Sequence, residues 1–448
     1  MQANAVPTPA DLCLRPEWVI PMTTPGAWLT DHAVIVTGGR IIDVLPADTV
    51  AAKYQPAREL ALPNQVLMPG LVNAHTHAAM TLFRGFADDL PLKTWLEDHL
   101  WPAEARMVDR EFATHGSELA IAEMLRGGTT CFNDMYFFPE ATAEAASRLR
   151  IRALIGLIII GFPSNWAKTT DAYFERGQAL HDSLRDMPLV RAAFAPHAPY
   201  SVDDAALRRV ETLASELDIP VHMHIHETRH EVTTAEREQG ERPLARLTRH
   251  GLVNERLIAV HMTELSQREI ANIARYGVSV AHCPQSNLKL ASGLCPVKAL
   301  LDAGVNVALG TDGAASNNDL DMLEEARTAA LLAKFSAQDP SAVSAGEALM
   351  MATLNGARAL GMGEEIGSIE IGKAADLITI DLDHPATQPV HDPVSQVVYA
   401  AGRDQVRNVW VGGEQRVANG VLVDIDTEAL HARARVWRDR LAALKHSG

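Results

Sequence analysis

The chain has 448 residues with a formal net charge of −16, and 47% of its residues are hydrophobic and 21% charged. This ordinary composition argues against disorder, and the length is enough for a large domain with an added subdomain. No lysine–arginine cluster stands out, so the charge argues against nucleic acid or an anionic membrane as a partner and favours a small-molecule substrate.

The first part of the chain consists of short β segments separated by turns, without a helix between them. HAVIVTGGRIIDVLP and LPNQVLMPG are two examples. We assign residues 1–65 to one half of a small β-sandwich.

Apolar runs follow, and they alternate with stretches of helical periodicity such as SELAIAEMLRGG. The runs cover residues 67–77, 129–135, 152–160, 190–199, 220–228, 257–262, 278–287 and 306–314. Near-continuous apolar strands that alternate with helices indicate a parallel sheet buried on both faces. Eight such units predict a (β/α)₈ barrel of the TIM type over residues 66–365.

β character returns after the barrel in GSIEIGKAADLITIDLD and VRNVWVGGEQRVANG. Residues 366–425 are therefore expected to complete the β-sandwich, so that both ends of the chain build it. Residues 426–448 contain TEALHARARVWRDRLAALK, which predicts a final helix whose apolar stripe serves packing or contact within a homo-oligomer.

Polar side chains that can bind metal recur where the predicted barrel strands end. In chain order they are His75, His77, Asp134, His197, His222, His224, His226, Glu227, His261 and Asp312. The active site of such a barrel lies at the C-terminal ends of its strands. His75 and His77 share one face of a strand through alternation, so both imidazoles can reach the same cation.

Three assignments stay open from the residues alone. His222, His224 and His226 lie on one face with a period of two, and the spacing does not decide which of them binds metal. Asp312 follows a Leu-Gly-Thr turn, where an aspartate can equally be a turn residue or a helix N-cap. We interpret Asp134 as structural.

The segments VLMPGLVNAHTH, MHIHET, AVHM and GTDGA together resemble the amidohydrolase superfamily, and the resemblance covers nearly the whole chain. Within it, DDLPLKTWLEDHLWPAEA, FAPHAPYS and GSIEIGKAADL are similar to the methylthioadenosine/S-adenosylhomocysteine deaminases. Guanine deaminases and triazine hydrolases share much of the pattern. The resemblance implies a hydrolytic deaminase that converts the 6-amino group of an adenosine-type nucleoside to the inosine-type product and ammonia.

The resemblance also implies one divalent metal ion, Zn²⁺ first and Fe²⁺ as the alternative. Its ligands would be His75, His77, His224 and Asp312, because the H-x-x-E spacing to Glu227 selects His224.

Roles in catalysis and in substrate binding follow from the same resemblance. Glu227 would be the catalytic acid and base, His261 would orient the attacking water, and Asp312 would pass a proton to the departing ammonia. The residues implied to bind the nucleoside are Glu104, for the ribose hydroxyls, His197 and Trp95.

Two features of the sequence bear on the substrate contacts and on the number of metal ions. The loop after the third strand, GFPSNWAKTT, lacks the arginine with which many of these deaminases contact substrate, and Asn165, Trp166 or Lys168 could replace it. The fourth strand ends in FAPHAP, without the lysine that binuclear relatives carbamylate to bridge two metals. The sequence therefore predicts a single metal ion.

Two alternative functions remain. A related deaminase or chlorohydrolase would act on guanine or a triazine, and a non-catalytic scaffold would use the barrel for binding alone. Glu104 and His197 favour a nucleoside over these ring substrates. Glu227 favours attack on an aromatic ring, since such a ring needs a proton donor, and the complete ligand set argues against a scaffold.

The cysteines and the first ten residues indicate the cellular compartment in which we expect the protein. Cys13, Cys131, Cys283 and Cys295 form no CxxC pair, so we expect free thiols in a reducing compartment. The segment MQANAVPTPA has neither the basic nor the apolar region of a secretory signal, and the apolar runs are far shorter than the ~20 residues of a membrane helix. We therefore expect a soluble, cytoplasmic protein.

Overall fold

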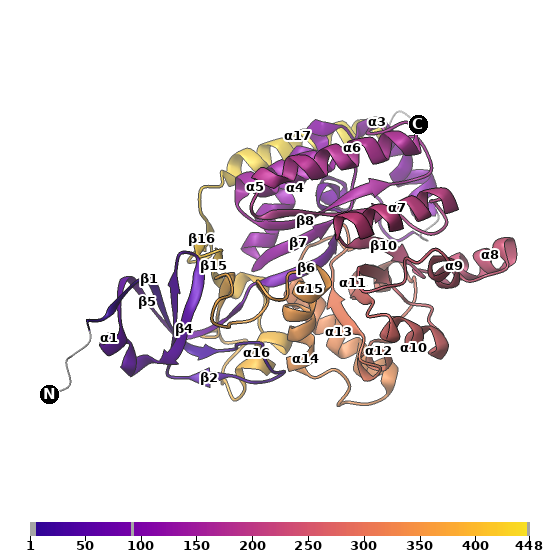
Figure 1. The fold of residues 1–448 in the computed structure, drawn as a ribbon. Helices are drawn as coiled ribbons and strands as arrows, with labels where there is room; N and C mark the ends of the chain where they lie inside the picture. The colour runs from indigo at the N-terminus through magenta and orange to yellow at the C-terminus, as the bar shows by residue number, and fades with distance from the viewer. Residues whose placement is uncertain (1–5, 91–93, 446–448) are drawn as a thin grey trace.

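A parallel sheet forms the centre of the molecule, of which the computed structural model describes residues 6–90 and 94–445 (Figure 1). Its eight strands in this part of the chain are β6 (Leu71–Thr76), β7 (Thr129–Asp134), β8 (Arg152–Ile159), β9 (Val190–Pro196), β10 (Val221–Ile225), β11 (Leu257–His261), β12 (Ser279–His282) and β13 (Asn306–Leu309). Each strand pairs with the next one along the chain. A hydrogen bond of 3.0 Å from Asp312 N to His75 O brings the two edges of the sheet together, so the barrel is nearly closed. The predicted (β/α)₈ architecture is confirmed.

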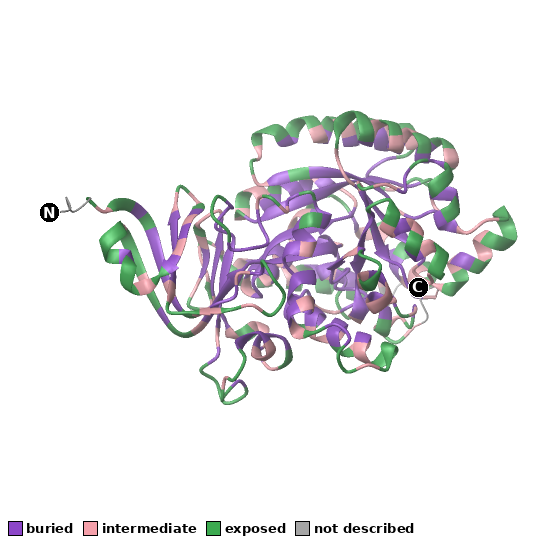
Figure 2. Cartoon of the chain, turned by 60° about the horizontal axis from the view of Figure 1, so that its bottom comes forward, coloured by how far each residue is buried: buried purple, intermediate pink, exposed green. Residues whose placement is uncertain are grey.

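Helices cover the outside of this barrel. They are η2 (Ala78–Phe83), η3 (Trp95–Leu100), α3 (Trp101–Met107), α4 (Arg110–Arg126), α5 (Pro139–Leu149), α6 (Thr170–Ser183), η4 (Leu184–Asp186), α7 (Asp204–Leu217), α8 (Arg229–Gln239), α9 (Pro243–Arg249), α10 (Gln267–Arg275), α11 (Pro284–Lys289), α12 (Val297–Asp302), α13 (Met322–Ala337), α14 (Ala345–Met351) and α15 (Leu354–Ala359). Figure 2 shows buried residues in the strands and exposed residues on the outer faces of the helices. All residues of β6, β7 and β8 are buried, as expected for a parallel sheet that is covered on both faces.

Polar side chains fix where several of these helices begin. Asp203 accepts a hydrogen bond of 2.7 Å from Ala206 N and so caps α7. Ser266 and Glu269 form a reciprocal capping box at the start of α10. Such caps satisfy backbone N–H groups that have no partner within the helix, and they let each helix start directly after a strand-end loop.

Strands from both ends of the chain form a second, mixed sheet, which lies to the left of the barrel in Figure 1. The strands in the described residues are β1 (Thr8–Val19), β2 (Leu29–Thr30), β3 (His32–Thr37), β4 (Arg40–Pro46), β5 (Tyr54–Pro69), β14 (Leu377–Asp381), β15 (Val406–Val411), β16 (Glu414–Ala418) and β17 (Val421–Leu422). Short helices accompany them: η1 (Ala47–Thr49), α1 (Val50–Lys53), α16 (Pro393–Tyr399) and η5 (Arg403–Gln405). Antiparallel pairing of β5 with β14 joins the two contributions. The sequence predicted a small β-sandwich built by both ends of the chain, and the structure confirms that strands from both ends build one mixed sheet, whereas the domain limits at residues 65, 365 and 425 stay a prediction.

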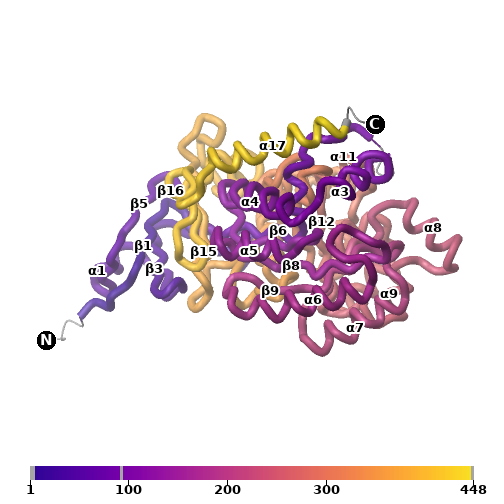
Figure 3. The backbone as a smooth tube through the Cα atoms, turned by 90° about the horizontal axis from the view of Figure 1, so that it is seen from above, coloured from indigo at the N-terminus to yellow at the C-terminus, as the bar shows by residue number. Residues whose placement is uncertain are grey.

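The last helix, α17 (Thr427–Lys445), lies across the outside of the barrel along α4, as Figure 3 shows. Trp437 on this helix is 3% exposed, and its indole N–H donates to His115 Nδ1 at 3.0 Å. The Trp437 side chain belongs to the same apolar cluster as Trp95 and Tyr136. α17 therefore supports one wall of the barrel mouth from outside.

The cysteines are buried and free, as expected; they are Cys13, Cys131, Cys283 and Cys295. Burial raises the pKa of Cys131 to about 12, so its thiol is protonated at neutral pH. Among the helices of residues 6–90 and 94–445, none combines the length and the apolar character needed to cross a membrane.

Candidate active site

Histidine and aspartate side chains converge at the C-terminal end of the barrel. Asp312 Oδ1 lies 3.2 Å from the Nε2 atoms of both His75 and His77. His224 Nε2 lies 3.2 Å from His75 Nε2. His261 joins His75 and His224 in a group whose ligand atoms all lie within 4.8 Å of one another. Imidazole nitrogens with one carboxylate are a donor set that zinc and iron favour, so this cluster is a candidate metal site.

Backbone carbonyls hold two of these imidazoles through their Nδ1 atoms. His77 Nδ1 donates to the carbonyl oxygen of Met135, and His224 Nδ1 donates to that of His197 at 2.9 Å. These bonds turn the Nε2 atoms toward the cluster, as second hydrogen bonds do for metal-binding histidines. Burial holds the pKa of His224 well below its ordinary value, so the ring is neutral and its Nε2 lone pair is available.

The structure separates the three histidines of the fifth strand. His224 points into the cluster. His222 lies behind it, with its Nε2 atom 2.8 Å from His75 Nδ1. His226 follows the end of β10 and has a left-handed backbone with φ of 52°, and its ring contacts Leu244 N at 3.3 Å and Glu264 O at 3.0 Å. His226 therefore lies outside the cluster.

Asp312 is bound from both sides of its carboxylate. Ser286 Oγ donates to Oδ2 at 2.7 Å, and Gly313 N donates to Oδ1 at 2.8 Å. Burial by itself would raise the pKa of Asp312, but the hydrogen bonds from His75 and His77 hold it well below its ordinary value. The carboxylate is therefore ionised and faces the cluster, rather than capping a helix.

Glu227 lies beside this cluster and makes few contacts of its own. Its Oε2 atom is 3.8 Å from His261 Nε2, and Ser292 Oγ approaches its Oε1 atom at 3.5 Å. Burial raises the pKa of Glu227, which brings the carboxyl closer to neutral pH, where it can exchange a proton. The side-chain amide of Asn287 contacts His261 Nδ1 at 3.0 Å and fixes the ring that faces Glu227.

The turn that carries Glu227 is held by two further side chains. The carboxylate of Glu231 accepts hydrogen bonds from His226 N at 3.1 Å and from Glu227 N at 2.8 Å. Thr263 Oγ1 donates to Glu227 O at 2.9 Å. A rigid turn of this kind restricts where the Glu227 carboxyl can lie.

A cavity of about 110 Å³ opens onto the cluster. The predicted site residues that line it are His77, Trp95, Glu104, His197, His224, Glu227, His261 and Asp312. His75 is fully buried behind this lining. Apolar side chains complete the wall, among them Met80, Ile158 and Phe162. Residues from both halves of the barrel thus enclose one small space.

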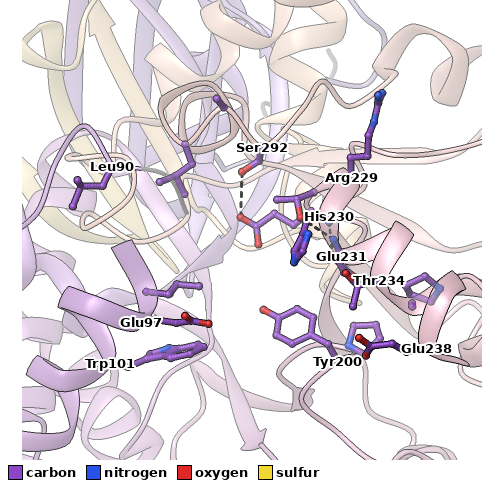
Figure 4. A pocket seen from close by; sticks show the side chains of 18 of the residues that line it. Leu90, Glu97, Trp101, Tyr200, Arg229, His230, Glu231, Thr234, Glu238 and Ser292 are labelled. Atoms are coloured by element: carbon purple, nitrogen blue, oxygen red, sulfur yellow. Dashed lines mark hydrogen bonds between the residues drawn. The ribbon is translucent and has the colours of Figure 1, made fainter. Parts of the chain in front are cut away.

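An outer chamber of about 1040 Å³ adjoins this cavity. The two spaces share Leu96, Trp101, Tyr200, Glu227 and Leu290. Figure 4 shows Glu97 and Trp101 on one side of the chamber and Tyr200 across from them. A substrate that reaches the inner cavity therefore has room for a long substituent outside it.

Glu104 lies on α3 and reaches the inner cavity from the side. Tyr136 Oη donates to Glu104 Oε1 at 2.6 Å. Burial raises the pKa of Glu104 to about 7, although the hydrogen bond from Tyr136 acts in the opposite direction. Trp95, 7% exposed, packs in the same apolar cluster as Tyr136.

The loop after β8 does not offer a simple replacement for the missing arginine. Asn165 Nδ2 donates to the carbonyls of Ala105 and Val108, so this side chain braces the end of α3. Trp166 is 2% exposed, and Lys168 is exposed. Phe162 is the residue of this loop that lines the inner cavity.

Several residues that hold the site were not predicted from the sequence. They are Tyr136, Glu231, Thr263, Ser286 and Asn287. The last two carried a usable signal, because they follow the seventh barrel strand and so belong to the C-terminal end of the barrel.

Gly310 packs directly against a residue of the cluster, which gives a first prediction. A Cβ atom at this position would lie 2.8 Å from His75 N and 3.0 Å from His75 O. We expect Gly310→Ala to lower the free energy of unfolding by ~1–3 kcal/mol, because the backbone of β6 cannot move away without disturbing the barrel. Urea denaturation measures this change. Gly402→Ala is the control, since a Cβ there meets nothing within 4 Å, and equal midpoints for the two variants would contradict the prediction.

The sequence of this chain is similar to those of known proteins. A family model for the amidohydrolase family matches residues 66–416, so the chain belongs to this family. The chain is 48% identical to a 5-methylthioadenosine/S-adenosylhomocysteine deaminase of Teredinibacter turnerae, over 97% of this chain and 99% of that one.

Two solved structures are similar over nearly the whole chain. An adenosine deaminase from Xanthomonas campestris with bound zinc has a TM-score of 0.97 and 55% identity, and the match covers 98% of this chain and 100% of that one. An atrazine chlorohydrolase from Arthrobacter aurescens, complexed with zinc, has a TM-score of 0.88 and 26% identity, with coverages of 95% and 99%.

Proposed function

We propose that this protein is a metal-dependent hydrolase that deaminates an adenosine-type nucleoside, such as methylthioadenosine, S-adenosylhomocysteine or adenosine. Water replaces the 6-amino group, and the products are the inosine-type nucleoside and ammonia. The observation that carries the proposal is that one cavity is lined by Glu104, Glu227 and most of the histidine–aspartate cluster, with His75 directly behind the lining. The names of the relatives at 48% and 55% identity support the same reaction.

One divalent ion, zinc or iron, would be held by His75, His77, His224 and Asp312. The donor set fits such an ion, because Asp312 is ionised, its Oδ1 atom lies 3.2 Å from the Nε2 atoms of His75 and His77, and His224 Nε2 lies 3.2 Å from His75 Nε2. When bound, the ion would supply a water acidic enough to attack at neutral pH. The fourth strand has no lysine that could bridge a second ion.

Glu227 would move the first proton. The ring carbon that bears the amino group is a poor electrophile until ring nitrogen N1 is protonated. Glu227 can take a proton from the attacking water and deliver it to N1, and its raised pKa suits both steps. His261, 3.8 Å from the Glu227 carboxyl, would orient the water. Asp312, held ionised, would take the proton of the hydroxyl group that has added to the ring carbon and pass it to the departing ammonia as the C–N bond breaks.

The nucleoside would be bound at the sides of the cavity. Glu104 would accept hydrogen bonds from the ribose hydroxyls, His197 would contact the nucleoside, and Trp95 would provide an apolar wall. The outer chamber would take the 5′ substituent. The homo-oligomeric assembly and the cytoplasmic location expected from the sequence stay predictions.

A screen of ammonia release tests the proposal against its alternatives. The panel contains adenosine, methylthioadenosine, S-adenosylhomocysteine, guanine and a chlorotriazine, and the triazine reaction is followed by chloride release as well. We expect the nucleosides to be turned over with the higher kcat/KM. Faster turnover of guanine or of the triazine would replace the proposal with the corresponding alternative, and no turnover of any substrate by metal-loaded protein would favour a scaffold.

Glu104→Ala gives a second prediction, which concerns substrate binding alone. Charge-assisted hydrogen bonds to two ribose hydroxyls would be lost, so kcat/KM for methylthioadenosine should fall roughly ten- to a hundredfold. A 2′-deoxynucleoside should lose much less, because one hydroxyl partner is already absent. Steady-state kinetics on both substrates measure the difference.

The matched control is Glu144→Ala, which removes an exposed glutamate of α5 that pairs with Arg110. It should leave both substrates unaffected. Equal losses on ribonucleoside and deoxynucleoside in Glu104→Ala would remove Glu104 from ribose binding and reopen the free-base alternatives.

A further inference from the structure

The segment that follows β7 contacts both ends of the inner cavity. Met135 accepts a hydrogen bond through its carbonyl from His77 Nδ1, in the candidate metal site. The next residue, Tyr136, donates through its hydroxyl to Glu104 Oε1 at 2.6 Å. Two consecutive residues thus connect the reacting end of the cavity with the end that faces the ribose.

The Tyr136 side chain is buried and packed against its neighbours. Its side chain is 5% exposed and packs in the apolar cluster that contains Trp95. The ring lies against Phe137 and His77, with centroid distances of 5.5 and 6.3 Å. A buried hydroxyl needs a hydrogen-bond partner, and Glu104 provides it.

This contact restricts Glu104 more than it restricts Tyr136. A glutamate side chain has several rotatable bonds, and α3 is a short helix on the outside of the barrel. The hydroxyl bond fixes Oε1 and so leaves Oε2 as the oxygen that can face the cavity. Burial raises the pKa of Glu104 to about 7, and the bond from Tyr136 opposes this rise, in the direction of the ionised carboxylate that accepts hydrogen bonds from both ribose hydroxyls.

We propose that Tyr136 is the positioning residue that sets the selectivity for ribonucleosides over 2′-deoxynucleosides, by holding the Glu104 carboxylate at a fixed distance from the reacting centre. The proposal rests on the proposed nucleoside deaminase function. Asn165 donates hydrogen bonds to the carbonyls of Ala105 and Val108 and so holds the C-terminal end of the same helix. Glu104 is thus positioned by two loops of the barrel rather than by α3 alone.

Tyr136→Phe tests the proposal because it removes the hydroxyl and keeps the buried ring. We expect kcat/KM for methylthioadenosine to fall about three- to tenfold, mainly through a higher KM, as loss of one hydrogen bond to a carboxylate would give. We expect kcat/KM for the 2′-deoxynucleoside to change by less than about twofold. Tyr54→Phe is the matched control, because Tyr54 also donates to a carboxylate, that of Asp43 at 2.9 Å, in the β domain away from the site.

A double-mutant cycle with Glu104→Ala completes the test. In the Glu104→Ala background, Tyr136→Phe should cause no further loss on the ribonucleoside, because the group that it positions is gone. Thermal denaturation of each variant checks that the fold is kept.

The possible failures are distinct. If Glu104→Ala lowers the ribonucleoside rate selectively and Tyr136→Phe behaves as the wild type, the positioning role is overturned and the proposed function stands. Equal losses on both substrates in Tyr136→Phe, or additive losses in the double variant, also overturn the positioning role. If Glu104→Ala itself shows no selectivity, ribose binding by Glu104 and the inference that rests on it both fail.

Discussion

Glu227→Gln is expected to keep its metal and to lose kcat by ~10²–10⁴-fold, the usual contribution of a positioned acid–base group. The substitution preserves the shape of the side chain and its contact with Ser292. It removes the ability to take a proton from water and give it to the ring, because an amide cannot do this. Steady-state kinetics measure kcat, and metal analysis of the same preparation measures the metal content.

Glu216→Gln, on the exposed surface of α7, is the control for the same chemical change and should leave kcat unaltered. Near-normal turnover by Glu227→Gln would show that another group protonates the ring. Loss of the metal together with activity would instead mean that Glu227 belongs to the ligand set.

His224→Ala should lower the metal content from about one ion per chain to near zero, since His224 is one of only four proposed protein ligands. Turnover should fall below detection for the same reason. His226→Ala should keep the metal, because its ring contacts Leu244 N and Glu264 O instead of the cluster. This second variant should be less stable by ~1–3 kcal/mol, the cost of leaving such buried groups unpaired.

Metal analysis per folded chain distinguishes the two variants whatever their stability. Retention by His224→Ala and loss by His226→Ala would place the wrong histidine in the ligand set. A reproducible content of two ions per chain in the unmodified protein would overturn the single-metal assignment.

The barrel could be predicted because its strands are buried on both faces. β6, β7 and β8 have no exposed residue, so the segments that contain them are rich in apolar residues, and polar groups such as His75 and Asp134 lie toward the strand ends. Parallel pairing in chain order then brings those ends together. His75 and Asp312, far apart in the chain, meet at 3.2 Å for this reason.

The fifth strand shows where periodicity stops being informative. Alternation places three histidines on one face, but β10 ends at Ile225 and His226 has a left-handed backbone, so its ring leaves that face. A strand end depends on local turn geometry, here held by Glu231 and Thr263, which no period reveals. Only the family resemblance favoured His224.

The contact between Tyr136 and Glu104 left no trace in the sequence. Tyr136 follows a strand and Glu104 lies on a helix, and neither segment shows a pattern that requires the other. Their meeting depends on how α3 folds over the barrel mouth, which is a tertiary effect. The same holds for the hydrogen bond from Asn165 to the carbonyl of Ala105 on α3, while its role as a substrate contact stays a prediction.

The position of α17 has a consequence for the order in which the protein is made. The barrel strands can all pair before this helix has been synthesised, because none of them needs it as a neighbour. Trp437, however, belongs to the cluster that backs Trp95 and Tyr136. A growing chain can therefore gather its histidine cluster early, while the apolar cluster around Trp95 and Tyr136 is completed only when α17 has emerged.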